Sequence, residues 1–172
     1  MLEVIDNAIS TQDDLESTVL NQQMSWYYDP WTIHGDKERP DNKYQFAHHL
    51  IIDAVSQSAM TEYMLQGFQH LPEFKDHILV RAKINMNLKY PVSPRLWHKD
   101  SQNPNAKVYI YYFHDTDGPT LVKRKWWKRS SIQPKKGRLL KMPAYYKHCS
   151  SMPKHHDRRI VLNLLFEPTL PS

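Results

Sequence analysis

The stretch HILVRAKINMNLKY, residues 77–90, alternates apolar and polar side chains along most of its length. Apolar residues occupy the even positions from Ile78 to Leu88, and polar residues occupy the odd positions from Arg81 to Lys89. Because successive side chains of a strand point to opposite faces, this period of two predicts a long β-strand with one apolar face. An apolar face of this length needs a core to cover it, so the chain must build a sheet.

Further strands are predicted on both sides of this one. The segments typical of strands are 46–52, 106–113, 119–127, 137–142 and 158–166. The sequence Asp115-Thr116-Asp117-Gly118, ahead of the strand at 119–127, is typical of a tight turn. Short strands with polar and proline-containing connections predict an antiparallel barrel or jelly roll.

The first third of the chain has a mixed character. Residues 2–5 are typical of a short strand, and Ser10 or Thr11 is a suitable N-cap for the helix that follows. A second helix is predicted over 57–70. The aromatic stretch 24–33 favours a strand or a packed loop over a linker.

A chain of 172 residues fits one domain and can bury a sizeable core without disulfides. We expect a single domain over 1–172 of the α+β class, mainly β with N-terminal helices. Residues 1–76 would form a helical and mixed support, and residues 77–167 the jelly-roll core.

Cysteine usage and the N-terminal sequence indicate the compartment. Cys149 is the one cysteine, so no internal disulfide can form and a reducing environment is favoured. The start, MLEVIDNAIS, lacks the basic and apolar regions of a signal peptide. No apolar run approaches the roughly 20 residues that a membrane helix needs. We expect a cytoplasmic protein with no membrane partner.

The formal charge of +5 is unevenly distributed, with basic residues concentrated at 123–129 and 135–138. Basic residues interleaved with tryptophan are suited to holding a nucleic-acid backbone and stacking on its bases. They also suit a solvated strand edge, where lysine and arginine prevent edge-to-edge aggregation. The pattern leaves both interpretations open.

His-x-Asp, a pattern with two potential metal ligands, occurs three times in the chain. The pairs are His34/Asp36, His98/Asp100 and His155/Asp157. The first and third pairs lie in polar, loop-like stretches, whereas His98 and Asp100 lie between two predicted strands. Side chains at i and i+2 of an extended backbone project to the same side, so this pair can share a cation.

A metal site would need a third ligand from a distant segment, and His148, just before the last predicted strand, is the best candidate. Two histidines and one carboxylate leave coordination positions open, as in non-haem Fe(II) oxygenases. The alternative is that these are ordinary polar residues near turns.

Four pieces of the sequence occur in an order that matches a known family. They are His98-Lys99-Asp100, the tyrosine-rich segment 108–120, His148 with the residues after it, and the segment 158–163 (RRIVLN). Over about residues 78–167, this order resembles the Fe(II)- and 2-oxoglutarate-dependent dioxygenases, in particular their small prolyl-hydroxylase-like branch of bacteria and phages. The resemblance implies a double-stranded β-helix, the cupin-like form of the jelly roll.

The resemblance also implies roles for particular residues. His98, Asp100 and His148 would hold Fe(II), and 2-oxoglutarate and O2 would be cosubstrates. Arg159 would bind the far carboxylate of 2-oxoglutarate, because a guanidinium matches a carboxylate and a buried lone carboxylate is costly. Tyr111 and Tyr90 are further candidates for the cosubstrate pocket. No catalytic residue is expected beyond the metal ligands.

Two departures from the family pattern leave alternatives open. His114 stands where the family often has asparagine, so it is a rival ligand or a turn residue. Arg158 precedes Arg159, and adjacent strand residues cannot both point into a barrel; the match to RIVLN favours Arg159.

The expected reaction is hydroxylation of an unactivated C–H bond in a peptidyl proline, an amino acid or another small molecule. One alternative is a nucleic-acid demethylase with the same iron chemistry, although Leu165 stands where that branch typically has a second arginine. The other is a non-catalytic jelly-roll binding module. The sequence does not indicate the oligomeric state.

Overall fold

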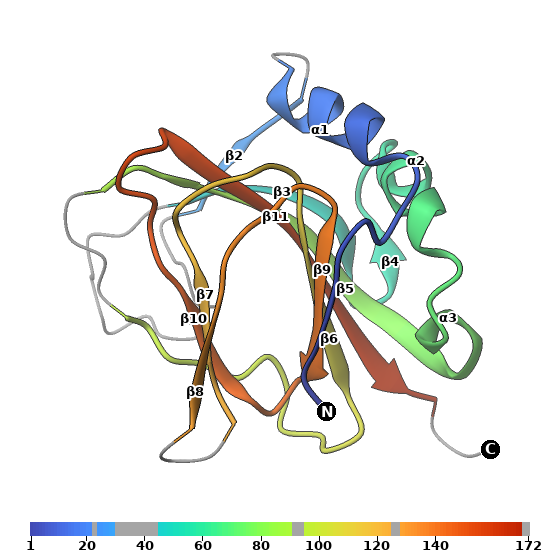
Figure 1. The fold of residues 1–172 in the computed structure, drawn as a ribbon. Helices are drawn as coiled ribbons and strands as arrows, with labels where there is room; N and C mark the ends of the chain where they lie inside the picture. Colours follow the sequence, from blue (N-terminus) through green and yellow to red (C-terminus); the bar gives the residue numbers. More distant parts are fainter. Residues whose placement is uncertain (22–23, 30–44, 91–94, 125–127, 170–172) are drawn as a thin grey trace.

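A computed structural model describes residues 1–21, 24–29, 45–90, 95–124 and 128–169 of the chain (Figure 1). In chain order the described elements are β1 (Glu3–Ile5), α1 (Gln12–Leu20), β2 (Tyr27–Asp29), β3 (Gln45–Ile52), β4 (Val55–Ser56), α2 (Thr61–Leu65), the 3₁₀ turn η1 (Gln66–Phe68), α3 (Glu73–Asp76), β5 (His77–Leu88), β6 (Lys107–Tyr112), β7 (Thr120–Lys123), β8 (Arg129–Ile132), β9 (Arg138–Pro143), β10 (Lys147–Ser150) and β11 (Arg158–Pro168).

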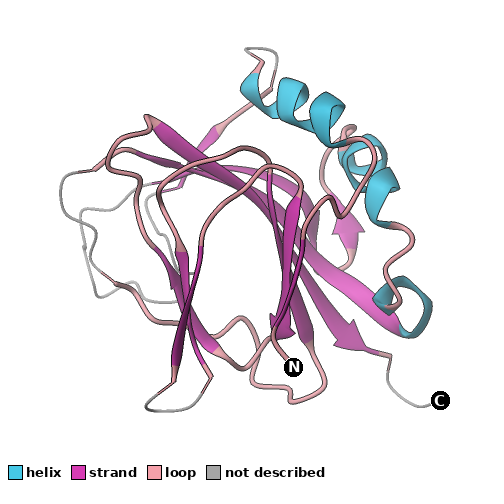
Figure 2. Ribbon diagram, viewed as in Figure 1, coloured by secondary structure: helices cyan, strands magenta, loops and turns pink. Residues whose placement is uncertain are grey.

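The strands form two antiparallel sheets. The large sheet has the order β1-β9-β6-β11-β5-β3-β2, with β4 paired to β3, and the small sheet has the order β10-β7-β8. The two sheets face each other (Figure 2), and Val122 and Ile132 of the small sheet join an apolar cluster with Val108, Ile110 and Leu140 of the large one. This arrangement confirms the predicted jelly-roll fold.

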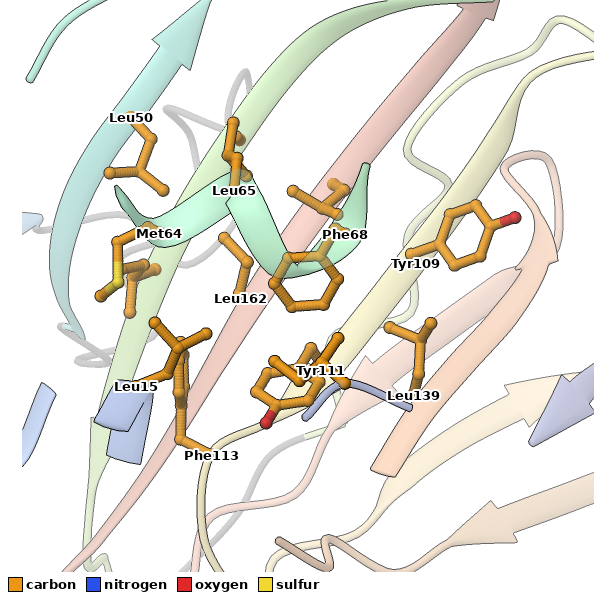
Figure 3. Close-up of a cluster of buried hydrophobic side chains, with 14 of the residues drawn as sticks. Leu15, Leu50, Met64, Leu65, Phe68, Tyr109, Tyr111, Phe113, Leu139 and Leu162 are labelled. Atoms are coloured by element: carbon orange, nitrogen blue, oxygen red, sulfur yellow. The ribbon is translucent and has the colours of Figure 1, made fainter. Parts of the chain in front are cut away.

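The helices cover the outer face of the large sheet. Leu15 of α1, Met64 of α2 and Phe68 of η1 point onto Tyr111 of β6 and Leu162 of β11 (Figure 3). The ring centroids of Phe68 and Tyr111 lie 5.1 Å apart in an edge-to-face arrangement. The main apolar core therefore lies on one side of the large sheet, and the space between the two sheets is on the other.

Strand β5 confirms the alternation in its sequence and shows where each face lies. Ala82 and Ile84 are buried in the core under the helices. The polar residues that alternate with them lie on the opposite face of the strand, where Asn85 and Asn87 line a cavity between the sheets and Asn87 is buried. The polar face of this strand therefore lines an interior cavity.

Three strands were not predicted: the two-residue β4, and the longer strands β8 and β10. The sequences RSSI of β8 and KHCS of β10 have no apolar alternation, so the sheet pairing of these segments is not visible in their composition. The predicted helix over 57–70 is shorter: α2 starts at Thr61 and tightens into η1 at Gln66. Gly67 packs there against Ile9 and the Thr11 side chain, where an added Cβ would lie 2.9 Å from Oγ1 of Thr11.

The described part of the chain contains no helix that is both long and apolar enough to span a bilayer.

Candidate active site

Three of the predicted ligands lie together at one edge of the small sheet. His148 is on β10, and His98 pairs with it as an isolated antiparallel bridge. The His98 amide donates to the His148 carbonyl at 3.0 Å, and the reverse bond measures 2.9 Å. One ligand atom each from His98, Asp100 and His148 lies within 4.8 Å of the other two. The backbone pairing thus brings residues 50 positions apart into one cluster.

Both imidazoles are oriented by main-chain carbonyls. Nδ1 of His98 lies 3.1 Å from the Leu96 carbonyl, and Nδ1 of His148 lies 3.1 Å from that of Tyr146. Because a carbonyl oxygen only accepts, each Nδ1 carries a hydrogen, and in the neutral form of either ring Nε2 presents a lone pair. Burial, followed by the nearby His148, lowers the pKa of His98 to about 4, so its imidazole is neutral at pH 7.

Asp100 completes the cluster from the segment after His98. Its side chain is 5% exposed, and Arg81 of β5 donates to Oδ1 through Nη2. Burial alone would raise the pKa of the Asp100 carboxyl, but contact with His148 and the Arg81 charge hold it well below its usual range. Asp100 is therefore ionised.

The second oxygen of Asp100 shows that the cluster suits a cation. Oδ2 makes no hydrogen bond within the described residues and lies 3.3 Å from Nε2 of His148. When Nε2 of His148 carries no hydrogen, it and Oδ2 of Asp100 can bind the same cation. Two imidazoles and one carboxylate suit Fe(II) better than Mg or Ca, which prefer all-oxygen sites, and they leave positions open.

A cavity of about 70 Å³ extends from the two histidines to Arg159 of β11. Arg159 is 2% exposed, and within the described residues it has no acidic partner. Its Nε donates to the Gly118 carbonyl at 2.8 Å, and its Nη2 donates to Oγ1 of Thr120 at 2.8 Å. Burial lowers the pKa of Arg159. A desolvated guanidinium without a counter-ion is costly, so the cavity is suited to an anion.

Thr120 and Tyr112 support the arginine. Oγ1 of Thr120 also accepts from the Tyr112 hydroxyl at 2.7 Å, and the guanidinium carbon of Arg159 lies 5.6 Å from the Tyr112 ring centre. Because Oγ1 of Thr120 accepts two hydrogen bonds, its own hydrogen is free to donate to a ligand.

The turn at Gly118 is closely packed against the same arginine. A Cβ at Gly118 would lie 2.6 Å from the Ser151 carbonyl oxygen and 3.1 Å from Cδ of Arg159. The predicted Asp-Gly turn therefore needs glycine for close approach.

Two candidates for the cosubstrate pocket do not lie in the cavity. Tyr111 is fully buried on the helix side of β6, between Phe68 and Phe113, and within the described residues its hydroxyl has no hydrogen-bond partner. Adjacent strand residues face opposite ways, so Tyr112 is the tyrosine on the Arg159 side, and the assignment to Tyr111 is corrected. Tyr90 is 40% exposed and does not line the cavity.

The structure also distinguishes the other candidate residues that lie in the site from those that do not. Arg158 is exposed, so Arg159 is the arginine that enters the cavity. His114 accepts a hydrogen bond from the Ile160 amide at 3.2 Å and is a turn residue apart from the metal cluster. His155 is exposed, and the pair His34/Asp36 lies outside the described residues.

Sequence reasoning missed the polar residues that support the site. Arg81, Asn85 and Asn87 are odd-numbered positions of β5, and Asn87 lies 3.5 Å from Nη1 of Arg159 through Oδ1. The alternation at 77–90 contained this signal, since a strand with one face on a core and four polar residues on the other can line a cavity between sheets.

Replacing Arg81 by methionine is expected to weaken metal binding about 10- to 100-fold, as for losses of groups that orient metal ligands. Methionine keeps much of the side-chain volume but leaves Oδ1 of Asp100 without its donor. Isothermal titration with Co(II) or Ni(II) measures the affinity. Lys75→Met, which removes an exposed cation on α3, is the matched control and should leave affinity unchanged. Equal affinities for wild type and Arg81→Met would show that Arg81 does not position the carboxylate.

Solved structures with a similar fold include several 2-oxoglutarate- and Fe(II)-dependent oxygenases. An oxidoreductase of the 2OG-Fe(II) oxygenase family from Burkholderia pseudomallei aligns with 96% of this chain and 85% of its own, at a TM-score of 0.70 and 13% identity. A Trichoplax adhaerens prolyl hydroxylase, solved with a hypoxia inducible factor peptide, aligns with 97% of this chain and 83% of its own (TM-score 0.64, 13% identity). HygX from Streptomyces hygroscopicus, with nickel and 2-oxoglutarate bound, aligns over 99% and 84% (TM-score 0.65, 12% identity).

No protein-family model and no curated protein sequence matches the chain. The structural likeness shows that the chain has the fold of the 2-oxoglutarate- and Fe(II)-dependent oxygenases. Among its structural neighbours are prolyl hydroxylases, including one from Pseudomonas putida.

Proposed function

We propose that this protein is an Fe(II)- and 2-oxoglutarate-dependent oxygenase that hydroxylates an unactivated C–H bond. The observation that supports this most is one cavity with a cluster of metal-ligand type at one end and, at the other, a buried arginine that has no acidic partner among the described residues. A dicarboxylate cosubstrate has the matching chemistry, since one end can bind a cation and the other a guanidinium.

In this proposal each residue has a definite task. His98, His148 and Oδ2 of Asp100 hold Fe(II), which together with 2-oxoglutarate and O2 supplies the oxidising chemistry. Arg159 and the Thr120 hydroxyl bind the far carboxylate of 2-oxoglutarate. Arg81 positions Asp100 by donating a hydrogen bond to Oδ1. The contacts of the two Nδ1 atoms with main-chain carbonyls keep each imidazole in the tautomer whose Nε2 can bind metal.

The substrate class we propose is a proline-containing peptide, with free amino acids and other small molecules next. Its support is the likeness to prolyl hydroxylases, one of which was solved with a peptide. A nucleic-acid demethylase receives less support, because Leu165 is buried in the apolar cluster between the sheets and brings no second cation to the cavity.

The direct test uses the purified full-length chain. Anaerobic addition of Fe(II) and then 2-oxoglutarate should give a weak visible charge-transfer band, and O2 should then yield succinate. A folded protein without a band would contradict the oxygenase proposal. A band without one-oxygen mass gain in any proline-containing peptide would contradict the substrate class alone. A binding module would give neither band nor succinate.

Arg159→Lys is expected to raise the KM for 2-oxoglutarate about 10- to 100-fold while kcat changes less. Lysine keeps the charge but loses the planar fork, and charge-assisted hydrogen bonds contribute about 1.5–3 kcal/mol each. Succinate formation against 2-oxoglutarate concentration gives both constants. The neighbouring exposed residue supplies the control, Arg158→Lys, which should match wild type. A raised KM in both variants, or in neither, would contradict the role of Arg159.

A further inference from the structure

Positive charge is concentrated in one part of the sequence. The segment between Asp117 and Asp157 contains eleven lysines and arginines and no acidic residue. It supplies all three strands of the small sheet, as well as β9 of the large sheet. The acidic residues that could balance it must come from elsewhere in the chain.

On the helix side of the molecule, that balance is achieved. Four cations of the connection between β8 and β9 and of β9 itself pair with acidic residues from the N-terminal half. The ion pairs are Lys135–Asp6, Lys136–Asp13, Lys136–Glu16, Arg138–Asp6 and Lys141–Glu73. These four cations are thus neutralised locally.

The small sheet differs. Lys147 of β10 lies opposite Lys123 of β7, and Lys123 lies opposite Arg129 of β8. We call these three residues the cationic row. Lys147 and Arg129 are exposed, and no acidic residue of the described chain pairs with any of the three. Like charges directly opposite each other in a sheet are destabilising, and no acidic residue of the described chain offsets this repulsion.

Trp97 holds two members of the row in place. Nζ of Lys123 lies 4.1 Å from the Trp97 ring centre, and the Arg129 guanidinium carbon lies 5.9 Å from it. These cation–π contacts restrain long side chains that would otherwise move freely, which lowers the entropy lost when an anion binds. Trp97 precedes His98 in an extended segment, so the row is on the face away from the candidate metal cluster.

We propose that the cationic row binds the phosphate backbone of a nucleic acid. Three neighbouring strands spread the charges over about 10 Å, and a nucleic-acid strand presents one phosphate per roughly 3.4 Å of its axis. Basic residues beside an aromatic ring are typical of surfaces that follow such a backbone. The surface is separate from the cavity, so this proposal does not depend on the oxygenase activity.

The test measures binding of a fluorescein-labelled oligodeoxythymidine of about 20 nucleotides to the full chain by anisotropy, without iron or 2-oxoglutarate. Affinity should fall as salt rises. Arg129→Glu and Lys147→Glu should each weaken binding about tenfold and lower the salt dependence by about one released counter-ion. Lys75→Glu on α3 makes the same change in net charge at an exposed site across the molecule, and it should weaken binding less than about twofold.

Three outcomes would overturn the proposal. If the wild-type protein shows no salt-dependent binding of the oligonucleotide, the cationic row is not a binding site. Equal losses in Lys75→Glu and the row variants would mean that net charge alone attracts the oligonucleotide. Tighter binding of a labelled polyglutamate of similar length, lost in the same variants, would assign the row to an acidic protein segment. Melting curves of all variants verify that each remains folded.

Discussion

His148→Ala is expected to abolish Fe(II) binding, the charge-transfer band with 2-oxoglutarate and succinate formation. The substitution removes one of three ligands from a buried cluster and leaves Oδ2 of Asp100 facing the space that the imidazole occupied. Two protein ligands bind Fe(II) much more weakly than three, so water displaces them from the ion. Metal content after dialysis and anaerobic visible spectra measure the loss.

His155→Ala is the matched control, because His155 forms the same His-x-Asp pattern with Asp157 but is exposed. Its backbone amide bonds to Asp117 at 3.0 Å, and alanine retains that contact. We expect metal content and turnover to equal those of wild type. If His148→Ala kept the unaltered band while its melting temperature also matched wild type, the ligand assignment would be wrong.

The contrast between these two histidines shows how far the sequence could lead. The spacing of His98 and Asp100 was equally present at His155, and only the position between strands separated the two. The partner of His98 could be named from the resemblance, but the bridge that joins it to His148 depends on β10, whose sequence KHCS has no strand signal. β10 forms a strand because of its long-range pairing with other parts of the chain and not because of its local strand propensity.

The tyrosines show a second limit. Alternation in β6 establishes that Tyr111 and Tyr112 face opposite sides, but both sides of this strand are apolar and buried, so the pattern does not say which side holds the cavity. The helices cover one face of β6 and the small sheet covers the other, and both faces of this strand carry apolar residues. The resemblance selected Tyr111, and packing of the helices placed it in the core.

Arg81 was missed for a related reason. It stands on the polar face of β5, which in an isolated strand would be taken for a solvated face. Its partner Asp100 lies beyond a connection, so no local spacing links the two. Only when the two sheets pack against each other does this common amphipathic pattern become part of a site.

Phe68→Ala is expected to reduce the free energy of unfolding by about 3–5 kcal/mol, the usual range for truncating a buried phenylalanine. Phe68 is fully buried where η1 contacts the large sheet, and its ring packs edge-to-face on Tyr111 (Figure 3). Truncation leaves a cavity between the helices and β6 and removes the aromatic contact. Urea denaturation followed by circular dichroism measures the change.

Tyr63→Ala provides the control within the same helical segment, since Tyr63 of α2 is 40% exposed and its hydroxyl lies 3.2 Å from Oγ1 of Thr18 at the surface. Tyr63→Ala should reduce the free energy of unfolding by less than about 1 kcal/mol. The Phe68 variant should still bind metal when folded, because His98 and His148 lie by the small sheet, on the other side of the large sheet. Equal costs for the two variants would contradict a stabilising role for the helix layer, whereas loss of metal binding in folded Phe68→Ala would show that this layer also determines the geometry of the site.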